Sequence, residues 1–141
     1  MVKDNFSLKG RVYIELNGKI VQEIDNLVVT TGKTFVAGRM ANASAGVMSH
    51  MAVGTGAVAA AIGNTTLGTE SARVALTSAT VSSADVIYVA TFPAGTGTAA
   101  LTEAGILNAS SSGTLLCRTV FSVVNKAAAD AMTITWTVTV S

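Results

Sequence analysis

The strongest constraint on this sequence is the strict alternation of residues 132–140 (MTITWTVTV), where apolar side chains take every second position and threonines fill the rest. Successive side chains of a β-strand point to opposite faces, so the pattern predicts a half-buried strand with an outer face of threonine. Valine, isoleucine and threonine are also residues that strands favour. The chain is therefore expected to bury one face of a sheet.

A hairpin signal lies near the N-terminus. Residues 9–16 alternate in the same way, Asn17-Gly18 follows, and residues 19–25 can return as the partner strand. Asn-Gly is typical of a type I′ turn, which needs positive φ at both central positions. The first quarter of the chain is predicted to be a β-hairpin.

The remaining pattern is mostly strand. Further strands are predicted over residues 47–53, 73–81, 85–92, 101–107 and 114–122, with one helix over 32–41 and a long loop over 57–68. About eight strands with turn signals every 8–12 residues favour a single all-β domain over residues 1–141, either an antiparallel β-sandwich or a jelly-roll-like barrel with one short helix. The expected core contains Ile14, Phe35, Tyr88, Phe92, Phe121 and Trp136.

Composition limits the kinds of partner. Only 12% of the residues are charged, where about 25% is usual, and the net charge is +1. A net charge near zero argues against nucleic-acid binding through phosphates, and no apolar run approaches the ~18 residues of a membrane span. The charged opening also lacks the apolar region of a secretory signal peptide. We expect a charge-poor surface prone to association.

Few residues could carry catalysis. His50 is the only histidine and Cys117 the only cysteine, so a nucleophile and base would need the fold to bring these two together. Cys117 alternates with apolar residues and is expected to be a small core residue. No His/Cys cluster has metal-ligand spacing. The chain is predicted to be no enzyme and to need neither a cofactor nor a metal.

Two glycine motifs are incomplete. The spacing from Gly54 to Ala59 fits part of a dinucleotide-binding fingerprint, but a tight turn at a sheet edge is favoured because the flanking strands suit hairpins. Thr31 to Thr34 (TGKT) ends like a phosphate-binding loop, but Leu27 stands where that motif needs its first glycine.

Four charged residues stand out, two because they stand three positions apart at a strand entrance and two because they interrupt small or apolar segments. Glu70, Arg73, Glu103 and Arg118 are predicted to form structural charge pairs, either within the fold or across a subunit boundary. An unpaired charge in such surroundings would be costly.

Several segments carry a family resemblance. They are NGKIVQEIDNLVVTTGK (17–33), MAVGTG (51–56), LGTESAR (67–73) and residues 90–141. Together they resemble a family of small structural proteins of tailed bacteriophages, some of which decorate the capsid. The resemblance implies a compact β-sandwich on the outside of a virion, commonly a homotrimer when it acts as capsid cement, and transfers no active site.

Three functions are therefore expected, in order. The first is a capsid decoration protein on the outer surface of the virion, assembled in the host cytoplasm, whose partners are the major capsid protein and copies of itself. The second is a tail, baseplate or tail-fibre module bound to those proteins. The third is a carbohydrate- or receptor-binding sandwich.

The N-terminal residues have two expected roles. Residues 1–8 either form an arm that adds to a neighbour, with Phe6 and Leu8 as apolar anchors, or pack on their own domain.

Overall fold

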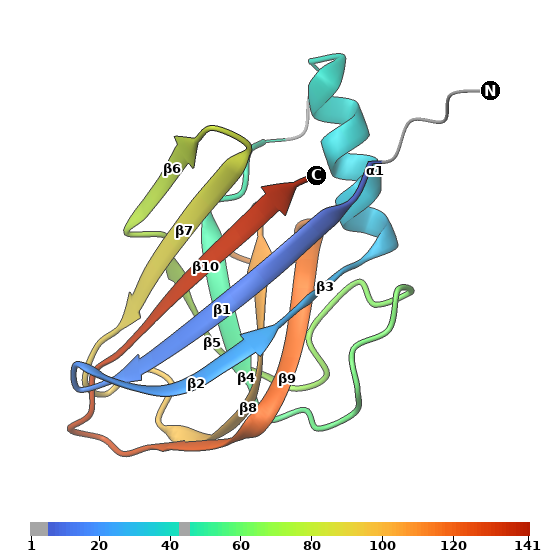
Figure 1. Cartoon of the computed structure of the whole chain (residues 1–141). Helices are drawn as coiled ribbons and strands as arrows, with labels where there is room; N and C mark the ends of the chain where they lie inside the picture. Colours follow the sequence, from blue (N-terminus) through green and yellow to red (C-terminus); the bar gives the residue numbers. More distant parts are fainter. Residues whose placement is uncertain (1–5, 43–45) are drawn as a thin grey trace.

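Two five-stranded antiparallel sheets pack face to face in the computed structural model, which describes residues 6–42 and 46–141 (Figure 1). The first sheet holds, in order, β2 (Lys19–Asp25), β1 (Leu8–Leu16), β10 (Met132–Val140), β7 (Asp85–Phe92) and β6 (Ser78–Ser82). The second holds β3 (Leu27–Val28), β9 (Leu115–Lys126), β8 (Ala99–Leu107), β4 (His50–Gly54) and β5 (Glu70–Ala75). This confirms the all-β, sandwich-like fold, with one short helix, α1 (Thr30–Met40), in the described part of the chain.

The alternation of β10 places this strand at the centre of the first sheet, between β1 and β7. Its apolar residues from Met132 to Val138 point into the space between the sheets and are buried, while its threonines form the outer face. Trp136 is fully enclosed there. One face of the central strand thus supplies much of the core, as the sequence pattern predicts.

The predicted N-terminal hairpin is present. Asn17 and Gly18 have φ values of 52° and 82°, the positive pair that a type I′ turn needs, and Leu16 pairs with Lys19 across the turn. The pairing shifts by one residue between Ile14 and Glu15. The hairpin therefore contains an irregularity that the turn signal alone does not reveal.

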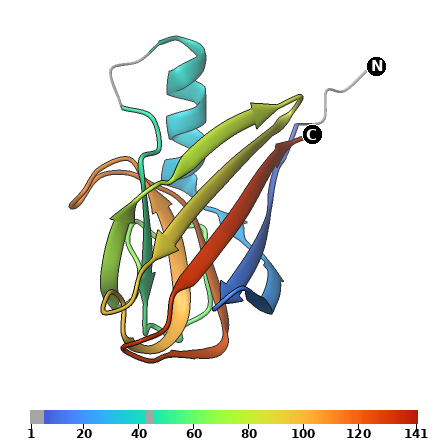
Figure 2. The ribbon, with the colours of Figure 1, turned by 90° about the vertical axis from the view of Figure 1, so that its left-hand side faces the viewer.

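The single strand predicted over residues 73–81 is wrong, because the chain changes sheets within it. The Leu76 N–H donates to the Ser49 carbonyl beside the second sheet (2.9 Å), and the Thr77 N–H donates to the Val89 carbonyl of the first (2.7 Å). The strands on either side, β5 and β6, belong to different sheets (Figure 2). Such a corner leaves the two-residue periodicity of the sequence intact, so periodicity could not locate it.

Helix α1 packs on β9 and begins two residues earlier than predicted. Gly32 is its buried residue, and a side chain there would collide with the backbone carbonyl of Leu116. The Thr31 hydroxyl donates to the Leu115 carbonyl (2.8 Å). Met40, the last residue of this helix, is exposed, because only the first turns of α1 reach the sheet.

The predicted core residues lie where expected, with one exception. Side chains of Ile14, Tyr88, Phe92, Phe121 and Trp136 are buried between the sheets. Phe35 is only half-buried, because it reaches the margin of the core from α1 rather than from a strand.

Candidate functional site

The most distinctive local structure is the segment 55–69, which joins β4 to β5 and which we call the anchored loop (Figure 1). None of its residues is charged. Between its ends it makes a turn in which the Asn64 N–H donates to the Ala61 carbonyl (3.0 Å) and the Ala61 N–H to the Asn64 side chain (2.8 Å). Two side chains of the neighbouring strands hold the rest of the loop in place.

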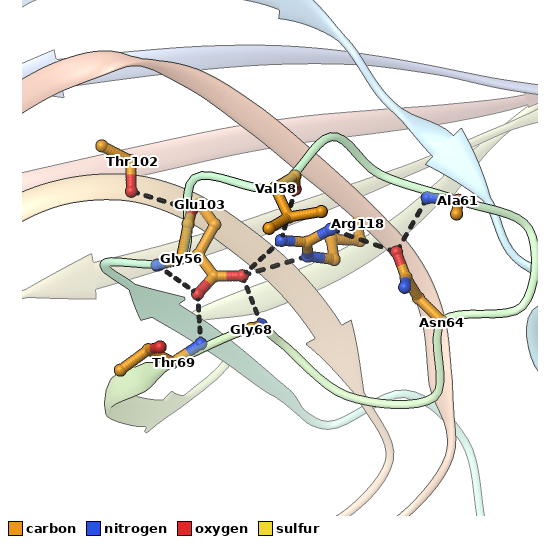
Figure 3. A network of polar contacts seen from close by, with 9 residues as sticks. All are labelled: Gly56, Val58, Ala61, Asn64, Gly68, Thr69, Thr102, Glu103 and Arg118. Carbon is orange, nitrogen blue, oxygen red and sulfur yellow. Dashed lines mark hydrogen bonds and ion pairs between the residues drawn. The ribbon is translucent and has the colours of Figure 1, made fainter.

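The first of these side chains is Glu103 of β8, which is fully buried. Its carboxylate accepts hydrogen bonds from the backbone N–H groups of Gly56, Gly68 and Thr69, each at 2.7 Å (Figure 3). The neighbouring Thr102 hydroxyl donates to the Gly56 carbonyl (2.9 Å). A single carboxylate therefore joins the beginning of the loop to its end.

The second is Arg118 of β9, which is 2% exposed. Its Nη2 lies 2.9 Å from Oε1 of Glu103, and its Nε donates to the same oxygen at 3.0 Å. The guanidinium also donates to the Asn64 side chain (3.1 Å) and to the Val58 carbonyl (3.0 Å) (Figure 3). Arg118 thus fixes the middle of the loop while Glu103 fixes its ends.

The electrostatics of this arrangement favour the charged pair. Burial raises the pKa of Glu103, but the three backbone N–H groups and the Arg118 guanidinium outweigh that effect, and the pKa lies below its usual value. Glu103 therefore stays ionised at neutral pH. A buried pair of this kind is stable only because nearly every polar atom has a partner.

Gly56 explains the glycine motif that resembles a dinucleotide-binding fingerprint. A Cβ at this position would collide with the carboxylate of Glu103. The residue is glycine because the backbone must approach an anion closely, but the anion is the protein's own side chain rather than a phosphate. The favoured interpretation of a tight glycine turn at the end of β4 agrees with this geometry.

The second predicted pair also lies within the chain. Glu70 binds Arg73 through two contacts, Nη2 to Oε1 at 2.7 Å and Nε to Oε2 at 2.9 Å. Arg73 Nη1 donates in addition to the carbonyls of Ala109 and Ser112, each at 2.9 Å. Arg73 thereby holds the turn that joins β8 to β9. The structure brings together Glu70 with Arg73 and Glu103 with Arg118, as two separate groups.

A third charged group was missed by the sequence reasoning. Arg11 of β1 contacts Glu23 (2.9 Å) and Asp25 (2.8 Å) of β2 on the exposed face of the hairpin. All three side chains are exposed to solvent, by 42%, 50% and 82%, in contrast to the pair beneath the anchored loop.

The anchored loop exposes apolar residues. Val58 is 80% exposed and Ile62 is 60% exposed, although neither lies at a chain end. A hollow of about 390 Å³ opens beside Val58, lined by uncharged residues of the loop and by Arg118. The loop is therefore a rigid, uncharged and partly apolar surface, which is a combination typical of a contact site.

The proposed N-terminal arm is only partly within the described residues. Leu8 is the first residue of β1 and pairs with Val140, and Ser7 exchanges backbone hydrogen bonds with Ser141, so the expectation that Leu8 anchors a free arm is wrong. Leu8 already has a partner strand in its own domain, β10, so it is not free to anchor an arm on a neighbouring molecule. Phe6 is exposed beside an apolar groove of about 300 Å³ that Val36 and Met40 also line. Residues 1–5 of the predicted arm lie outside the described residues.

The lone histidine and cysteine occupy different surroundings. The His50 ring shares a hydrogen bond with the Ser49 hydroxyl (2.8 Å), whereas Cys117 is fully buried in the core. Burial raises the pKa of the Cys117 thiol, which keeps it protonated and unreactive. Across residues 6–42 and 46–141, no group of three or more His, Cys, Asp or Glu residues could hold a metal ion. The one described helix is too short to cross a bilayer.

Comparison with known proteins adds no relative, since neither a family model, nor a curated protein, nor a solved structure matches the chain.

Proposed function

We propose that this chain is a non-enzymatic structural protein of a tailed-phage virion that decorates the capsid and stabilises the assembled shell. The observation that carries the proposal is the anchored loop, an uncharged segment that exposes Val58 and Ile62 and is held by the Glu103–Arg118 pair. The phage virion is proposed as the setting because several segments of the chain resemble structural proteins of tailed bacteriophages.

A pre-formed loop suits binding to a lattice. Ordering a flexible loop on binding costs free energy, and here the ordering is already achieved by bonds within the fold. A protein that binds the assembled shell, and not its free subunits, adds its binding energy to the stability of the shell. Because many copies bind one shell, each contact needs only modest affinity.

The geometry gives less support to a sugar-binding role. Binding sites for sugars usually present aromatic rings to the ligand, but Trp136 and Tyr88 are buried between the sheets. The tail, baseplate or tail-fibre alternative shares the fold and is separated from the capsid role by copy number.

The test is to purify virions of the phage that encodes the chain and to measure its copy number by quantitative mass spectrometry. A copy number comparable to that of the major capsid protein is expected. A copy number at the level of tail proteins would replace the capsid role with the tail role, and absence from the particles would overturn both.

A double variant of the loop tests whether its exposed apolar residues contact the shell. Val58→Asp combined with Ile62→Asp is expected to release the protein from the particles, because both charges would enter an apolar contact. Ile20→Asp, which alters another exposed apolar residue, on β2, is the matched control and should remain bound. Retention of the loop variant at the wild-type level would contradict the proposed role of the loop.

A further inference from the structure

The four edges of the two sheets are protected to different degrees. Within the described residues, the edge strands are β2 and β6 of the first sheet and β3 and β5 of the second. An edge offers unpaired backbone groups to other chains, and proteins usually protect it with charges, irregular pairing or shortness. Three of the four edges carry such protection: β2 and β5 contain charged residues and adjoin a register shift, and β3 has two residues.

β6 lacks these protections. Its sequence, SATVS, contains no charge and no proline, and its pairing with β7 is continuous from Ser78 to Ser82. All five of its residues are exposed, and Val81 is 74% exposed despite being apolar. Figure 2 shows the β6–β7 hairpin projecting along one side of the sandwich. The strand is an open template for another strand.

The direction of its backbone groups follows from the hairpin. Ser82 pairs with Asp85 across a two-residue turn, and the pair that closes such a turn is a hydrogen-bonded one. Hydrogen-bonded and non-hydrogen-bonded pairs then alternate along the strands, so Ser78, Thr80 and Ser82 bond to β7. The backbone N–H and C=O groups of Ala79 and Val81 point outward.

We infer that the partner of this edge is β6 of a second copy of the chain, paired antiparallel about a two-fold axis through Thr80. The sequence SATVS has nearly the same residue types in both directions, so the axis sets serine opposite serine, Thr80 opposite Thr80, and Ala79 opposite Val81 of the second copy. A two-fold interface requires this kind of self-complementarity.

The backbone fits the same register. Ala79 and Val81 have the outward groups, and the axis through Thr80 pairs each of them with the other, giving four new hydrogen bonds. If the register shifted by one residue, the outward N–H and C=O groups of Ala79 and Val81 would face residues whose backbone groups already bond to β7. If it shifted by two, only one hydrogen-bonded pair of these residues would remain instead of two. Because β6 carries no charge, the pairing also brings no like charges together.

The contact is small. Five paired residues fall well below the area of a standard interface, so we expect weak association in solution that becomes effective when many copies are held close together. The two-fold pair differs from the trimer that the family resemblance implies. The inference rests on β6 alone and does not depend on the capsid role.

The first test is sedimentation and NMR on the full chain, from about 10 μM to about 1 mM, where contacts of this size are populated. The mass should rise from monomer toward dimer, and the amide signals of Ala79 and Val81 should shift with concentration. A monomer throughout, a trimer, or shifts that map to another strand would overturn the inference.

Charge variants at the axis test the register. Thr80→Lys and Thr80→Glu should each abolish self-association, because like charges would face each other, and mixing the two should restore a dimer. Thr80 is exposed, so both variants should fold, which their thermal unfolding checks. Ile20→Lys on the protected edge β2 is the matched control and should associate like the wild type. Undiminished dimerisation of either Thr80 variant alone, or failure of the mixture to pair, would refute a two-fold axis at this residue.

Discussion

The two sheets use their charged residues in opposite ways. On the second sheet, Glu103 and Arg118 are removed from water and hold an uncharged loop through its backbone. On the first sheet, Arg11 bridges Glu23 and Asp25 in the open, across a hairpin whose strands already pair. Both are pairs of arginine with carboxylates. The buried pair holds a loop against the second sheet, whereas the exposed group only joins two strands that already pair through their backbones.

Glu103→Gln should produce the largest effect. The change removes the negative charge, leaves the Arg118 guanidinium buried and uncompensated, and turns amide hydrogens toward backbone donors. Breaking a buried pair in this way costs about 3–5 kcal/mol. Urea unfolding measures the loss, and a variant within about 1 kcal/mol of the wild type would show that the pair does not support the fold.

A double variant separates the cost of an unpaired charge from the cost of unsatisfied backbone donors. Apolar replacement of a buried ion pair is often neutral or stabilising, but Glu103→Leu with Arg118→Met would also remove the acceptor of three backbone N–H groups. Each buried donor left unsatisfied costs about 1–3 kcal/mol. Because three such donors offset the gain from removing the uncompensated charge, we expect the double variant to stay about as unstable as Glu103→Gln. Full recovery, measured in the same urea experiment, would mean that the carboxylate does not hold the loop.

Acid should weaken the buried group selectively. Because the pKa of Glu103 is lower in the folded chain than its unfolded value of about 4.3, its contribution is present above that value and is lost as the pH falls through the folded pKa. The stability difference between wild type and Glu103→Gln should therefore be constant near neutral pH and shrink below about pH 4. A difference that is independent of pH down to the acid limit of folding would contradict the assigned ionisation.

Arg11→Ala should produce the smallest effect. The side chain and both of its partners are exposed, and such pairs are screened by salt and add little to stability. The melting temperature should change far less than in Glu103→Gln, and the change should disappear in 1 M salt. A loss similar to that of the buried variant would erase the distinction between the two groups.

Part of this architecture could be predicted from local sequence. The alternation that ends at Val140 and the Asn17-Gly18 turn are local signals, and both predicted the correct element. The pairing of Arg11 was not accessible, because counting from the turn sets it opposite Ile24, whereas the register shift sets it opposite Asp25. A shift of this kind leaves no distinct residue type behind.

Only the charged pair of the candidate site could be predicted, and not the loop that it holds. Glu103 and Arg118 stand out as charges in apolar strands, and the expectation that they pair needs only the cost of burying a charge. Apart from the Asn64 side chain, their other partners are backbone groups of Gly56, Val58, Gly68 and Thr69. Backbone donors and acceptors are the same at every residue, so the sequence offers no sign of which loop covers the pair.

The most direct test is amide hydrogen exchange at Gly56, Gly68 and Thr69, whose backbone N–H groups donate hydrogen bonds to the Glu103 carboxylate. In the wild type these amides should exchange slowly, although they lie in a loop. In Glu103→Gln they should exchange rapidly while the amides of β8 and β9 stay protected. Rapid exchange in the wild type, or equal protection in the variant, would contradict the claim that a buried ion pair holds this surface in place.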